Sequence, residues 1–485
     1  MMENILLIGC GPHARTFYFP AMNKMKTDTR LRIAATVDLK SNQQVVEEFL
    51  SKNYPDCSRY YVDPSGDILS QETVTVLNGI LEKEQIGGVI ISTDPLNHKN
   101  YALWALSQHL HLLLDKPITT CVDATLDIKQ AEKIETDYKE LLAAYQETLK
   151  VKKTAFIVCV HRRYHPGINS ALQLIGDVSA KTGCPVTNFH SYHCDGQWRL
   201  PCEMITQSHH SYYDGHGKVS HSGYHFIDGL YRFWTAGEKS GKTADKVEVF
   251  SSFVRPRGLI KQLTRNDYNN IFGKEYETIN PLQDIELHDK FSRFGEIDAE
   301  LNFTFYEQSE PVGLATLSLL HNGFSRRSWM LAGTDLYKGN GRVKHEQHRI
   351  HLGPFLCIQI HSYQSKDKHD TSNASDLALG GNNHFEMFVF RNTGIIGGKP
   401  VEKFTLADLT NEKGFTENEL HIHKIKEGAI REFADFINGK LKREELQSDI
   451  LDHVIPVRIM SAIYRSYVKR QHGQSPLENI MLKPF

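Results

Sequence analysis

The stretch Ile5-Leu-Leu-Ile-Gly-Cys-Gly-Pro-His-Ala14 decides the fold. Its apolar run predicts a short buried strand, which breaks into a glycine-rich turn before a helical segment. In that context a G-x-G-x-x-A pattern is typical of dinucleotide binding, because the glycines allow a tight turn and a close approach of the backbone to pyrophosphate. The free N–H groups at the start of the helix would face the phosphates. The candidate cofactor-binding residues here are Gly9, Cys10, Gly11, Pro12, His13 and Ala14.

A second strand-like run, Ile33–Val37, ends in Asp38, 24 residues beyond Ala14. A carboxylate at about this spacing accepts hydrogen bonds from the adenosine ribose, and it would repel a 2′-phosphate. The sequence therefore favours NAD over NADP, although Lys40 and Ser41 leave NADP possible. The alternative is a turn that needs glycine only for its shape.

Composition sets broad limits on the class of protein. A chain of 485 residues exceeds one ordinary core, so we expect two domains. The net charge of −2 argues against nucleic acid or an anionic membrane as the main partner. Eight cysteines without a C-x-x-C pair indicate neither a disulfide framework nor a zinc ribbon, and they fit a reducing cytoplasm. The apolar runs are too short for a signal peptide or a membrane span.

The first third of the chain alternates strand and helix. Buried strands are predicted at Gly88–Ser92, His111–Leu114 and Phe156–Val160, with an irregular region at Tyr54–Gly66 and a long helix over Asp123–Leu149. Alternation of this kind predicts parallel strands with helices on both faces. We expect a Rossmann domain over residues 1–150.

The chain then changes character. Runs of β-forming residues predict an α+β domain with a large open, mostly antiparallel sheet over residues 151–440; they lie at Val247–Val254, Leu301–Tyr306, Val312–Leu320, Phe355–His361 and Phe385–Phe390. The Gly-, Asp- and Asn-rich segments Gly237–Lys290 and Gly339–Asn383 are interpreted as insertions. In residues 441–485, apolar residues between Ile450 and Val468 share a helical face, which predicts a helix that packs back on a domain.

Two polar clusters directly follow predicted strands. Strand ends in an open parallel sheet border the ligand crevice, so residues there are candidates for the cofactor site. The first cluster provides Thr93, Asp94, Pro95 and His98, where Thr93 or Asp94 can also cap a helix. The second is Asp115-Lys116-Pro117, whose lysine can hold a substrate oxygen and lower the pKa of a hydroxyl, or can be an ordinary loop residue.

A third cluster lies in Gly217–Asp228. Helical spacing predicts His221, His225 and Asp228 on one face. An imidazole suits the removal of a proton from an alcohol while hydride leaves its carbon. A single histidine on such a face is more often structural, so its neighbours carry the functional interpretation.

Taken together, these clusters resemble the Gfo/Idh/MocA (glucose–fructose oxidoreductase / inositol dehydrogenase) family. Its members carry a G-x-G-x-x-G/A turn, a T-P-x-x-x-H-like turn, an E-K-P motif and a D-x-G-x-H helix. The corresponding segments appear here in the same order as Gly9–Ala14, Thr93–His98, Asp115–Pro117 and His221–His225. The resemblance covers roughly residues 1–235 and resumes at Pro456–Ser466.

The resemblance implies a Rossmann domain joined to a C-terminal α/β domain, with Lys116 and His225 as the catalytic pair. It implies an NAD(P)-dependent hydride transfer between nicotinamide and a carbinol or carbonyl of a sugar, sugar derivative or polyol. Arg162, Arg163 and Tyr164 resemble the family's substrate-side segment. Trp198, Arg199 and Asp228 are further substrate-binding candidates.

His221 departs from the family pattern, since it stands where the family has aspartate. A second imidazole disfavours protonation of His225 by like-charge repulsion, whereas a carboxylate would favour it. We predict that His225 acts as a base with an unraised pKa, or that His221 shares the proton relay. The departure also leaves open a chemistry other than sugar dehydrogenation.

Three alternatives stay open at this point. Seven histidines between His190 and His225, with nearby cysteines and carboxylates, make a metal-assisted reaction conceivable, although their spacing fits no zinc pattern and we predict no metal. An NAD-dependent lyase or glycoside hydrolase would use the same residues for transient oxidation. A redox-silent nucleotide-binding protein would need neither Lys116 nor His225.

The expected partner is a small, carbohydrate-like substrate, with no nucleic acid and no membrane. An exposed face on an open sheet favours self-association, so we expect a homodimer or homotetramer. The identity of the substrate depends on loops of the second domain, which the pattern does not reveal.

Overall fold

The computed structural model describes residues 2–207, 210–328, 330, 341–365, 384–409 and 421–482. Contacts divide the chain into two compact units. Unit 1 comprises Met1–Thr120, Ile134–Tyr164 and Ile422–Val457, and unit 2 comprises Cys121–Lys133, His165–His421 and Arg458–Phe485. Because both units are discontinuous in sequence, the boundaries at 150 and 440 stay predictions about where the linkers fall.

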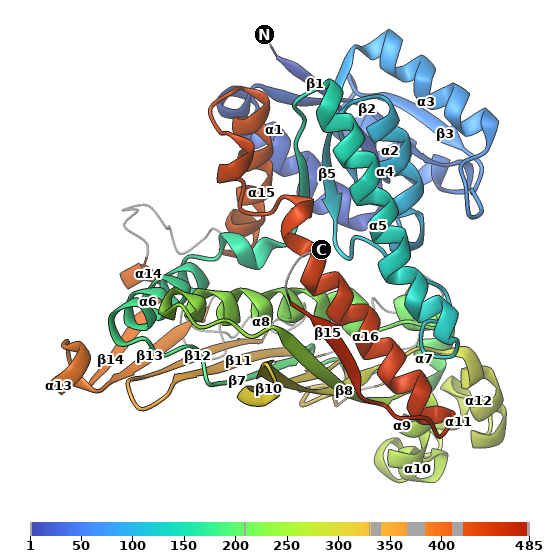
Figure 1. Cartoon of the computed structure of the whole chain (residues 1–485). Helices are drawn as coiled ribbons and strands as arrows, with labels where there is room; N and C mark the ends of the chain where they lie inside the picture. The colour runs from blue at the N-terminus through green and yellow to red at the C-terminus, as the bar shows by residue number, and fades with distance from the viewer. Residues whose placement is uncertain are drawn as a thin grey trace. The chain divides into compact units, whose positions relative to one another are not determined.

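Unit 1 contains a six-stranded sheet in the order β3-β2-β1-β4-β5-β6, and every neighbouring pair is parallel (Figure 1). The chain reverses direction across the sheet at β1 and β4, which is the topological switch of a Rossmann fold. The predicted parallel sheet is confirmed. Its strands are β1 (Glu3–Ile8), β2 (Leu31–Leu39), β3 (Ser58–Val62), β4 (Ile86–Ile91), β5 (His111–Asp115) and β6 (Phe156–Cys159).

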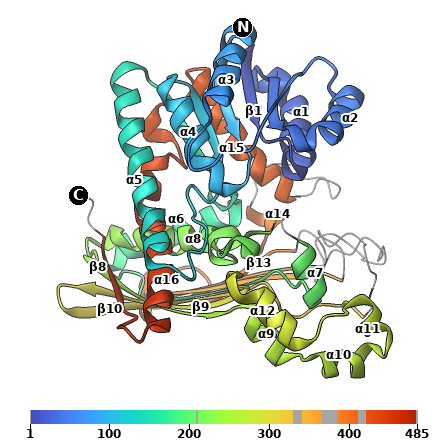
Figure 2. The same cartoon turned by 90° about the vertical axis from the view of Figure 1, so that its right-hand side faces the viewer.

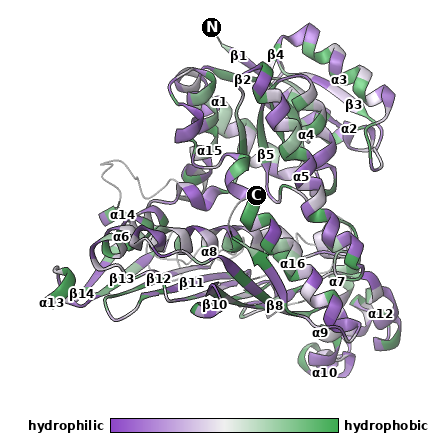
Figure 3. Ribbon diagram, in the orientation of Figure 1, coloured by the Kyte–Doolittle hydropathy of each residue, from purple (hydrophilic) through white to green (hydrophobic). Residues whose placement is uncertain are grey.

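Helices pack on this sheet through apolar faces. Along α3, Leu77 and Ile80 are buried, and Figure 3 shows hydrophobic and hydrophilic residues interleaved, as in a helix with one side packed. The central strand β1 is buried on both faces from Ile5 to Ile8, so it is a continuous apolar run rather than an alternating one. The helices are α1 (Phe19–Thr29), α2 (Gln43–Asn53), α3 (Gln71–Glu84), α4 (His98–Ser107), most of α5 (Ile128–Val151) and α15 (His421–Ile437).

The helix α15 returns to unit 1 from far along the chain. Ile430 and Phe433 belong to the same buried cluster as Ile5 of β1 and Met22 of α1. The strongly apolar side of this helix therefore completes the core of unit 1. The sequence analysis did not predict this helix.

Unit 2 contains a nine-stranded sheet in the order β14-β13-β12-β11-β7-β10-β9-β8-β15. Only β7 and β10 pair in parallel; all the other pairs are antiparallel, so the predicted mostly antiparallel sheet is confirmed. The strands are β7 (Asn188–Cys194), β8 (Lys246–Val254), β9 (Asp298–Glu307), β10 (Glu310–Leu320), β11 (Val343–Leu352), β12 (Leu356–Ser365), β13 (Glu386–Arg391), β14 (Val401–Thr405) and β15 (Glu478–Met481).

Burial alternates along these strands, as in β10, because one face of the sheet is packed and the other meets solvent. Helices α6 and α8 lie on the packed face (Figure 2). The helices of unit 2 are α6 (Pro166–Thr182), α7 (Pro201–Thr206), α8 (Tyr224–Ala236), α9 (Pro256–Gln262), α10 (Arg265–Phe272), α11 (Glu275–Ile279), α12 (Asp284–Lys290), α13 (Thr393–Ile396), α14 (Leu406–Leu409) and most of α16 (Val454–Gln471).

Two sequence interpretations need correction. Tyr54–Gly66 is not wholly irregular, because it contains the edge strand β3. The described part of Gly339–Asn383 is not an insertion, because β11 and β12 pair there as central strands; the remainder lies outside the described residues. Beyond β8, the segment Gly237–Lys290 forms a series of short helices, and its interpretation as an insertion stays a prediction.

The strand β11 was missed for a physical reason. Its residues Lys344 to Arg349 are all polar, so no apolar alternation marks them. The inward position is filled by His348, whose ring lies near Phe189, Phe226 and Phe233 and bonds to Ser191. A buried, hydrogen-bonded histidine replaces the expected apolar residue.

Among the helices that the structure describes, none combines the length and hydropathy that a bilayer span requires.

Candidate functional site

The glycine turn of unit 1 has the geometry that the sequence predicts. Gly9 has a φ of +93°, and a Cβ at this position would lie 2.5 Å from the carbonyl oxygen of Ser92 at the end of β4. Only glycine fits such a conformation and approach. A Cβ at Gly11 would meet no atom within 4 Å, so the turn leaves open space over its backbone. The turn can therefore admit a phosphate group close to the main chain.

The helix that follows begins with an unusual turn. Arg15 donates its N–H to the carbonyl of Gly11, and a π-turn spans Ala14–Tyr18 before α1. Pro20 lacks the N–H that the helix would bond to Thr16, which favours such an irregularity. The π-turn presents His13 and Tyr18 toward Asp115, with His13 Nε2 3.9 Å from Asp115 Oδ2.

Asp38 stands at the end of β2 beside the turn. Its Oδ2 accepts a 2.6 Å hydrogen bond from the N–H of Cys10, and its Oδ1 accepts from Leu39 and Asn42. These donors fix the carboxylate at the place where the sequence analysis expected the ribose-binding acid. The thiol of Cys10 is buried, and burial together with Asp38 raises its pKa to about 12, so it stays protonated.

The neighbouring Lys40, which kept NADP possible, is already paired. Its Nζ lies 2.7 Å from Asp63 and 3.8 Å from Glu72, and the hydrogen bond to Asp63 raises its pKa. Because the two carboxylates offset the charge of Lys40, its attraction for a 2′-phosphate is weaker.

The segment after β4 is held as a helix start. Asp94 accepts from the N–H of Leu96 and Pro95 opens a short 3₁₀ turn, so the capping interpretation of this cluster holds. His98 is fully buried; its Nδ1 bonds to the carbonyl of Pro117 at 2.8 Å and its Nε2 to that of Thr93 at 3.3 Å. Burial lowers its pKa. His98 thus ties together two of the predicted loops, and cofactor contact by this cluster stays a prediction.

Asp115 is the last residue of β5, and Lys116 follows it. Asp115 accepts hydrogen bonds from Tyr18 at 2.6 Å and Ser92 at 2.7 Å. Burial by itself raises the pKa of Asp115, but His13 and these two hydroxyls outweigh it and lower the value. Lys116 is half-buried and is joined to Pro117 by a cis peptide bond. The motif therefore presents an ionised carboxylate and an ammonium side by side at the strand end.

Sequence reasoning missed Lys426 of α15. Its Nζ lies 5.2 Å from the centre of the Phe17 ring, and burial lowers its pKa although the Asp115 carboxylate acts in the opposite direction. A cation from residue 426 therefore joins the cluster around Asp115. No local motif marks this lysine, since only the packing of α15 brings it there.

Two predicted substrate residues have structural partners within unit 1. Arg163 is buried; it donates to the carbonyl of Gln447 and lies 3.6 Å from Asp452. Tyr164 donates to Glu432 of α15 at 2.6 Å. Both side chains hold the returning C-terminal segment, and substrate binding by them stays a prediction.

In unit 2, a π-turn over Val219–Gly223 precedes α8. His221 in the turn is exposed, whereas His225 and Asp228 in the helix are buried, at 3% and 1% exposure. The predicted common face assumed the spacing of an α-helix, whereas a π-turn contains more residues per turn. His221 therefore lies in different surroundings from His225 and Asp228. The catalytic role of His221 and His225 stays a prediction.

A buried ionic cluster adjoins this turn. Lys218 donates to Asp195 Oδ2 at 2.5 Å and to His193 Nδ1 at 2.9 Å. Arg342 donates to the carbonyl and to Oδ1 of Asp195, and His321 Nδ1 lies 3.5 Å from Oδ2. Burial opposes the ionised form, but Lys218 and His321 hold the pKa of Asp195 well below its usual range. Sequence reasoning noticed Asp195 only as a possible metal ligand.

Trp198 and Arg199 enter different surroundings although they are adjacent. The Trp198 ring stacks with Tyr268 and Phe272, so the short helices of Gly237–Lys290 cover it. Arg199 is 4% exposed and donates to Tyr212 Oη at 3.0 Å and to Gln197 Oε1 at 2.7 Å. The alternation of side chains across extended backbone separates a packing residue from a polar one.

The histidines of this region do not form a metal site among the described residues, where no group of three or more metal-ligating side chains converges. His210 instead stacks on Tyr212 at 4.0 Å and lies 5.5 Å from the ring of His221. Burial, with help from Arg199, lowers the pKa of His210 well below its usual value.

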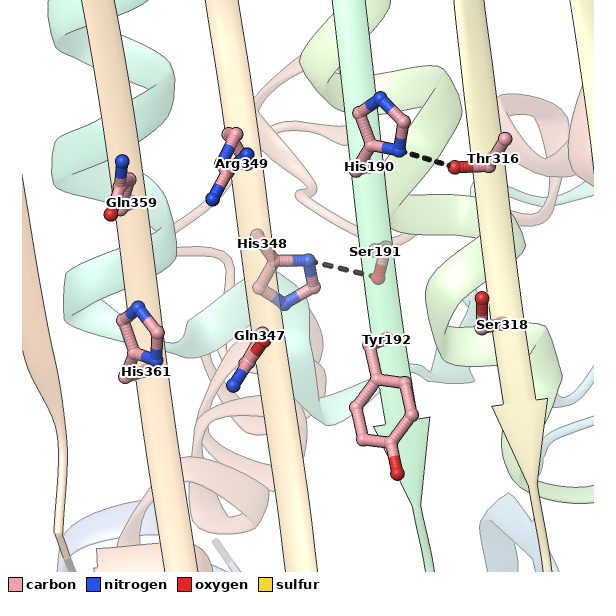
Figure 4. Close-up of a pocket in the computed structure, with 10 residues that line it drawn as sticks. All are labelled: His190, Ser191, Tyr192, Thr316, Ser318, Gln347, His348, Arg349, Gln359 and His361. Carbon is pink, nitrogen blue, oxygen red and sulfur yellow. Dashed lines mark hydrogen bonds between the residues drawn. The ribbon is translucent and has the colours of Figure 1, made fainter.

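A shallow pocket lies on the open face of the nine-stranded sheet (Figure 4). His190, Arg349, Gln359 and His361 line it from β7, β11 and β12, and His190 bonds to Thr316 of β10 at 2.6 Å. It contains none of the predicted site residues.

Comparison with known proteins agrees with this geometry. Residues 3–167 match the model of the GFO_IDH_MocA family, an oxidoreductase family with an NAD-binding Rossmann fold. Residues 3–167 therefore match the Rossmann domain of the Gfo/Idh/MocA oxidoreductase family. The resemblance drawn from the glycine turn and the later motifs is therefore confirmed, and unit 1 is an NAD-binding Rossmann unit. A comparison with curated proteins found no match.

Solved structures of similar fold cover nearly the whole of this chain. An NAD-binding oxidoreductase from Klebsiella pneumoniae is 13% identical, with a TM-score of 0.58 and 100% of both chains covered. An aldose–aldose oxidoreductase from Caulobacter crescentus complexed with glycerol is 12% identical, with a TM-score of 0.56, and covers 99% of this chain and 100% of its own. At this identity the likeness establishes the fold alone.

A third neighbour is a 3-ketoreductase from Actinomadura kijaniata, complexed with NADP and TDP-benzene. It is 12% identical, with a TM-score of 0.55 and coverage of 96% of this chain and 97% of its own. The likeness of fold to these solved structures thus extends through unit 2, beyond the residues that the family model matches.

Proposed function

We propose that this protein transfers hydride between NAD and a carbinol or carbonyl carbon of a sugar, sugar derivative or polyol. The observation that carries the proposal is the glycine turn, with Gly9 at positive φ, open space at Gly11 and Asp38 fixed by the N–H of Cys10. Sugar-related activity is supported by neighbours described as an aldose–aldose oxidoreductase and a 3-ketoreductase.

In this proposal the residues of the turn hold the cofactor. The pyrophosphate lies against the backbone at Gly11, where the first helical N–H groups donate hydrogen bonds to it. Asp38 accepts hydrogen bonds from the adenosine ribose. The bound nicotinamide supplies or takes up the hydride. The charge of Asp38 and the pairing of Lys40 with Asp63 support NAD over NADP.

The proposal assigns the proton chemistry to Lys116 and His225. The Lys116 ammonium stabilises the substrate oxygen as its proton leaves, and the His225 imidazole accepts that proton. The adjacent Asp115 is held ionised by Tyr18 and Ser92 and keeps the field at the strand end favourable to a protonated lysine.

The test begins with the nucleotide. The full-length protein is purified without added cofactor, and the nucleotide released on denaturation is identified by mass spectrometry. The protein is then supplied with NAD⁺ and a panel of aldoses, polyols and sugar nucleotides, and NADH is followed by absorbance. Accumulation of NADH with one member of the panel supports the proposal; product formation with no NADH would indicate transient oxidation instead.

Two further parts of the proposal concern the cell. All eight cysteines are free thiols, which supports a reducing cytoplasm. The outward face of the nine-stranded sheet bears the exposed apolar residues Leu314 and Phe390, which supports a homodimer or homotetramer. Light scattering coupled to size-exclusion chromatography tests the second part, and a monomeric mass at micromolar concentration would refute it.

A further inference from the structure

Arg199 is a buried cation without a carboxylate partner among the described residues. Its side chain is 4% exposed, and its donors reach two neutral acceptors, Tyr212 Oη and Gln197 Oε1. Its Nε has no hydrogen-bond partner. A buried guanidinium ordinarily pairs with an anion, since transfer of an unpaired charge from water costs several kcal/mol.

The groups around Arg199 do not neutralise it. Burial raises the pKa of Tyr212 to about 12, so the phenol stays protonated near neutral pH. Burial also lowers the pKa of His321 to about 4 and that of His210 well below its usual value, so both rings are uncharged. The only full charge on these side chains is the guanidinium itself.

The carboxylates of the cluster are committed elsewhere. Asp195 accepts hydrogen bonds from Lys218 and Arg342, and Glu203 accepts two hydrogen bonds of 2.7 Å from Arg327. Asp298 accepts from the N–H groups of His321 and Asn322. Three cations, Lys218, Arg342 and Arg327, form ion pairs with the two carboxylates Asp195 and Glu203. Arg199 contacts neither carboxylate.

The cluster reaches the surface of unit 2. His210 is half-buried and its ring lies 5.5 Å from that of the exposed His221. Ser222, next in sequence, is also half-buried and directs its hydroxyl to Asp195 at 3.5 Å. His210 also stacks on Tyr212, which accepts a hydrogen bond from Arg199, so ring contacts link the exposed His221 turn to the side chains around Arg199.

We propose that Arg199 binds a carboxylate of the substrate, so that the substrate is an acidic sugar derivative such as an aldonate or uronate. This inference rests on the proposed function, which it narrows to one class of substrate. Guanidinium and carboxylate match as parallel donors and acceptors, and the unpartnered Nε supplies one of the two donors of such a pair. A single uncommitted cation matches a singly charged carboxylate better than a doubly charged phosphate.

The experiment measures binding separately from turnover. Isothermal titration of the full-length protein, saturated with NAD⁺, uses pairs of ligands that differ only in the carboxylate: D-galacturonate with D-galactose, and D-gluconate with D-glucitol. We expect the acid of at least one pair to bind tenfold or more tighter than its neutral partner. Glucose 6-phosphate and glucose form a third pair that tests for phosphate instead.

Variants then locate the preference. Arg199→Gln should reduce the ratio of acid to neutral affinity to near one, and Arg199→Lys should retain part of it, since the charge remains. Arg349→Gln, which changes an exposed arginine on the open face of the sheet, is the matched control and should leave the ratio unchanged. Thermal unfolding of each variant establishes that it is folded. If Arg199→Gln does not fold, Arg199→Lys still tests the proposal.

The outcomes separate the two proposals. NADH formation from a neutral sugar at a rate equal to that from its acid would overturn the carboxylate proposal and support the hydride transfer. Tighter binding of the phosphate pair, or loss of the acid preference in Arg349→Gln rather than in the Arg199 variants, would also overturn it. Acid-selective binding that depends on Arg199, without NADH formation, would support Arg199 and count against the dehydrogenase.

Discussion

The glycine turn of unit 1 and the ionic cluster of unit 2 are built in opposite ways. In the turn, Gly9, Gly11 and Ala14 lie within one short stretch, and the backbone itself makes the site. In the cluster, Asp195, Lys218 and Arg342 come from separated segments, and buried side chains make the site. A site formed by the conformation of the backbone can be recognised from local sequence. A site formed by charged side chains cannot, because it depends on how strands and loops pack together.

The largest effect that sharpens this comparison is expected at Lys116. Lys116→Ala should lower kcat on the order of 10³-fold, because it removes the cation proposed to stabilise the substrate oxygen. NAD affinity should change less than about threefold, since the backbone turn is untouched. Steady-state kinetics and titration of NAD⁺ measure the two quantities, and Lys99→Ala on the preceding helix α4 is a control. An equal loss of binding and turnover would assign Lys116 to structure.

The turn itself is tested by a pair of glycines. Gly9→Ala should lower the free energy of unfolding by about 3 kcal/mol, because the new Cβ meets the Ser92 carbonyl and the backbone has positive φ. Gly11→Ala should leave stability nearly unchanged, since its Cβ meets nothing within 4 Å, yet it should weaken NAD binding. Urea denaturation and NAD⁺ titration separate the two; similar stability losses in both variants would contradict the proposed division of roles.

In unit 2, the buried carboxyl of Glu296 is expected to make the stability of the fold depend on pH. This carboxyl is fully buried, accepts bonds from Val219 and Tyr464, and burial raises its pKa to about 7. The pKa of Glu296 is higher in the folded protein than in the unfolded chain, so the folded state is favoured while the carboxyl is protonated. The free energy of unfolding therefore falls as pH rises from about 4.5, the ordinary pKa, through about 7, the pKa in the folded protein. The loss should reach about 3 kcal/mol by pH 8.

Glu296→Gln should remove this pH dependence, because the amide does not ionise. Denaturation of both proteins between pH 5 and pH 8 measures the effect, and Glu300→Gln on the exposed side of β9 is the control. Parallel pH curves for wild type and Glu296→Gln would show that the buried carboxyl is not the source.

The smallest expected effect concerns the choice of nucleotide. Asp38→Asn should weaken NAD binding about tenfold and narrow the preference over NADP, because hydrogen bonds from the ribose to a charged acceptor are lost. Asp63→Asn, which removes a carboxylate from Lys40 without touching the turn, is the matched control. Affinities for NAD⁺ and NADP⁺ in the three proteins measure the shift; an unchanged ratio in Asp38→Asn would leave the preference unexplained.

Much of this could be predicted from sequence because it depends on near neighbours. The parallel sheet followed from apolar runs that alternate with helices, and the turn from glycine spacing. The prediction failed at β11, where polar residues and a buried His348 conceal the strand. It also failed for α15, whose apolar side fits unit 1 only because the chain returns there.

The sequence by itself determined the Rossmann unit, the conformation of the glycine turn and the place of the acid at residue 38. These depend on φ angles and side-chain size within a few residues of each other, or on one strand paired beside another. Only the tertiary structure decided that Lys40 is already paired, that Lys426 joins the Asp115 cluster and that Arg199 is buried without a carboxylate. The physical reason is that the energy of a charge depends on burial and on partners distant in sequence, and neither is encoded in the spacing of residues along the chain.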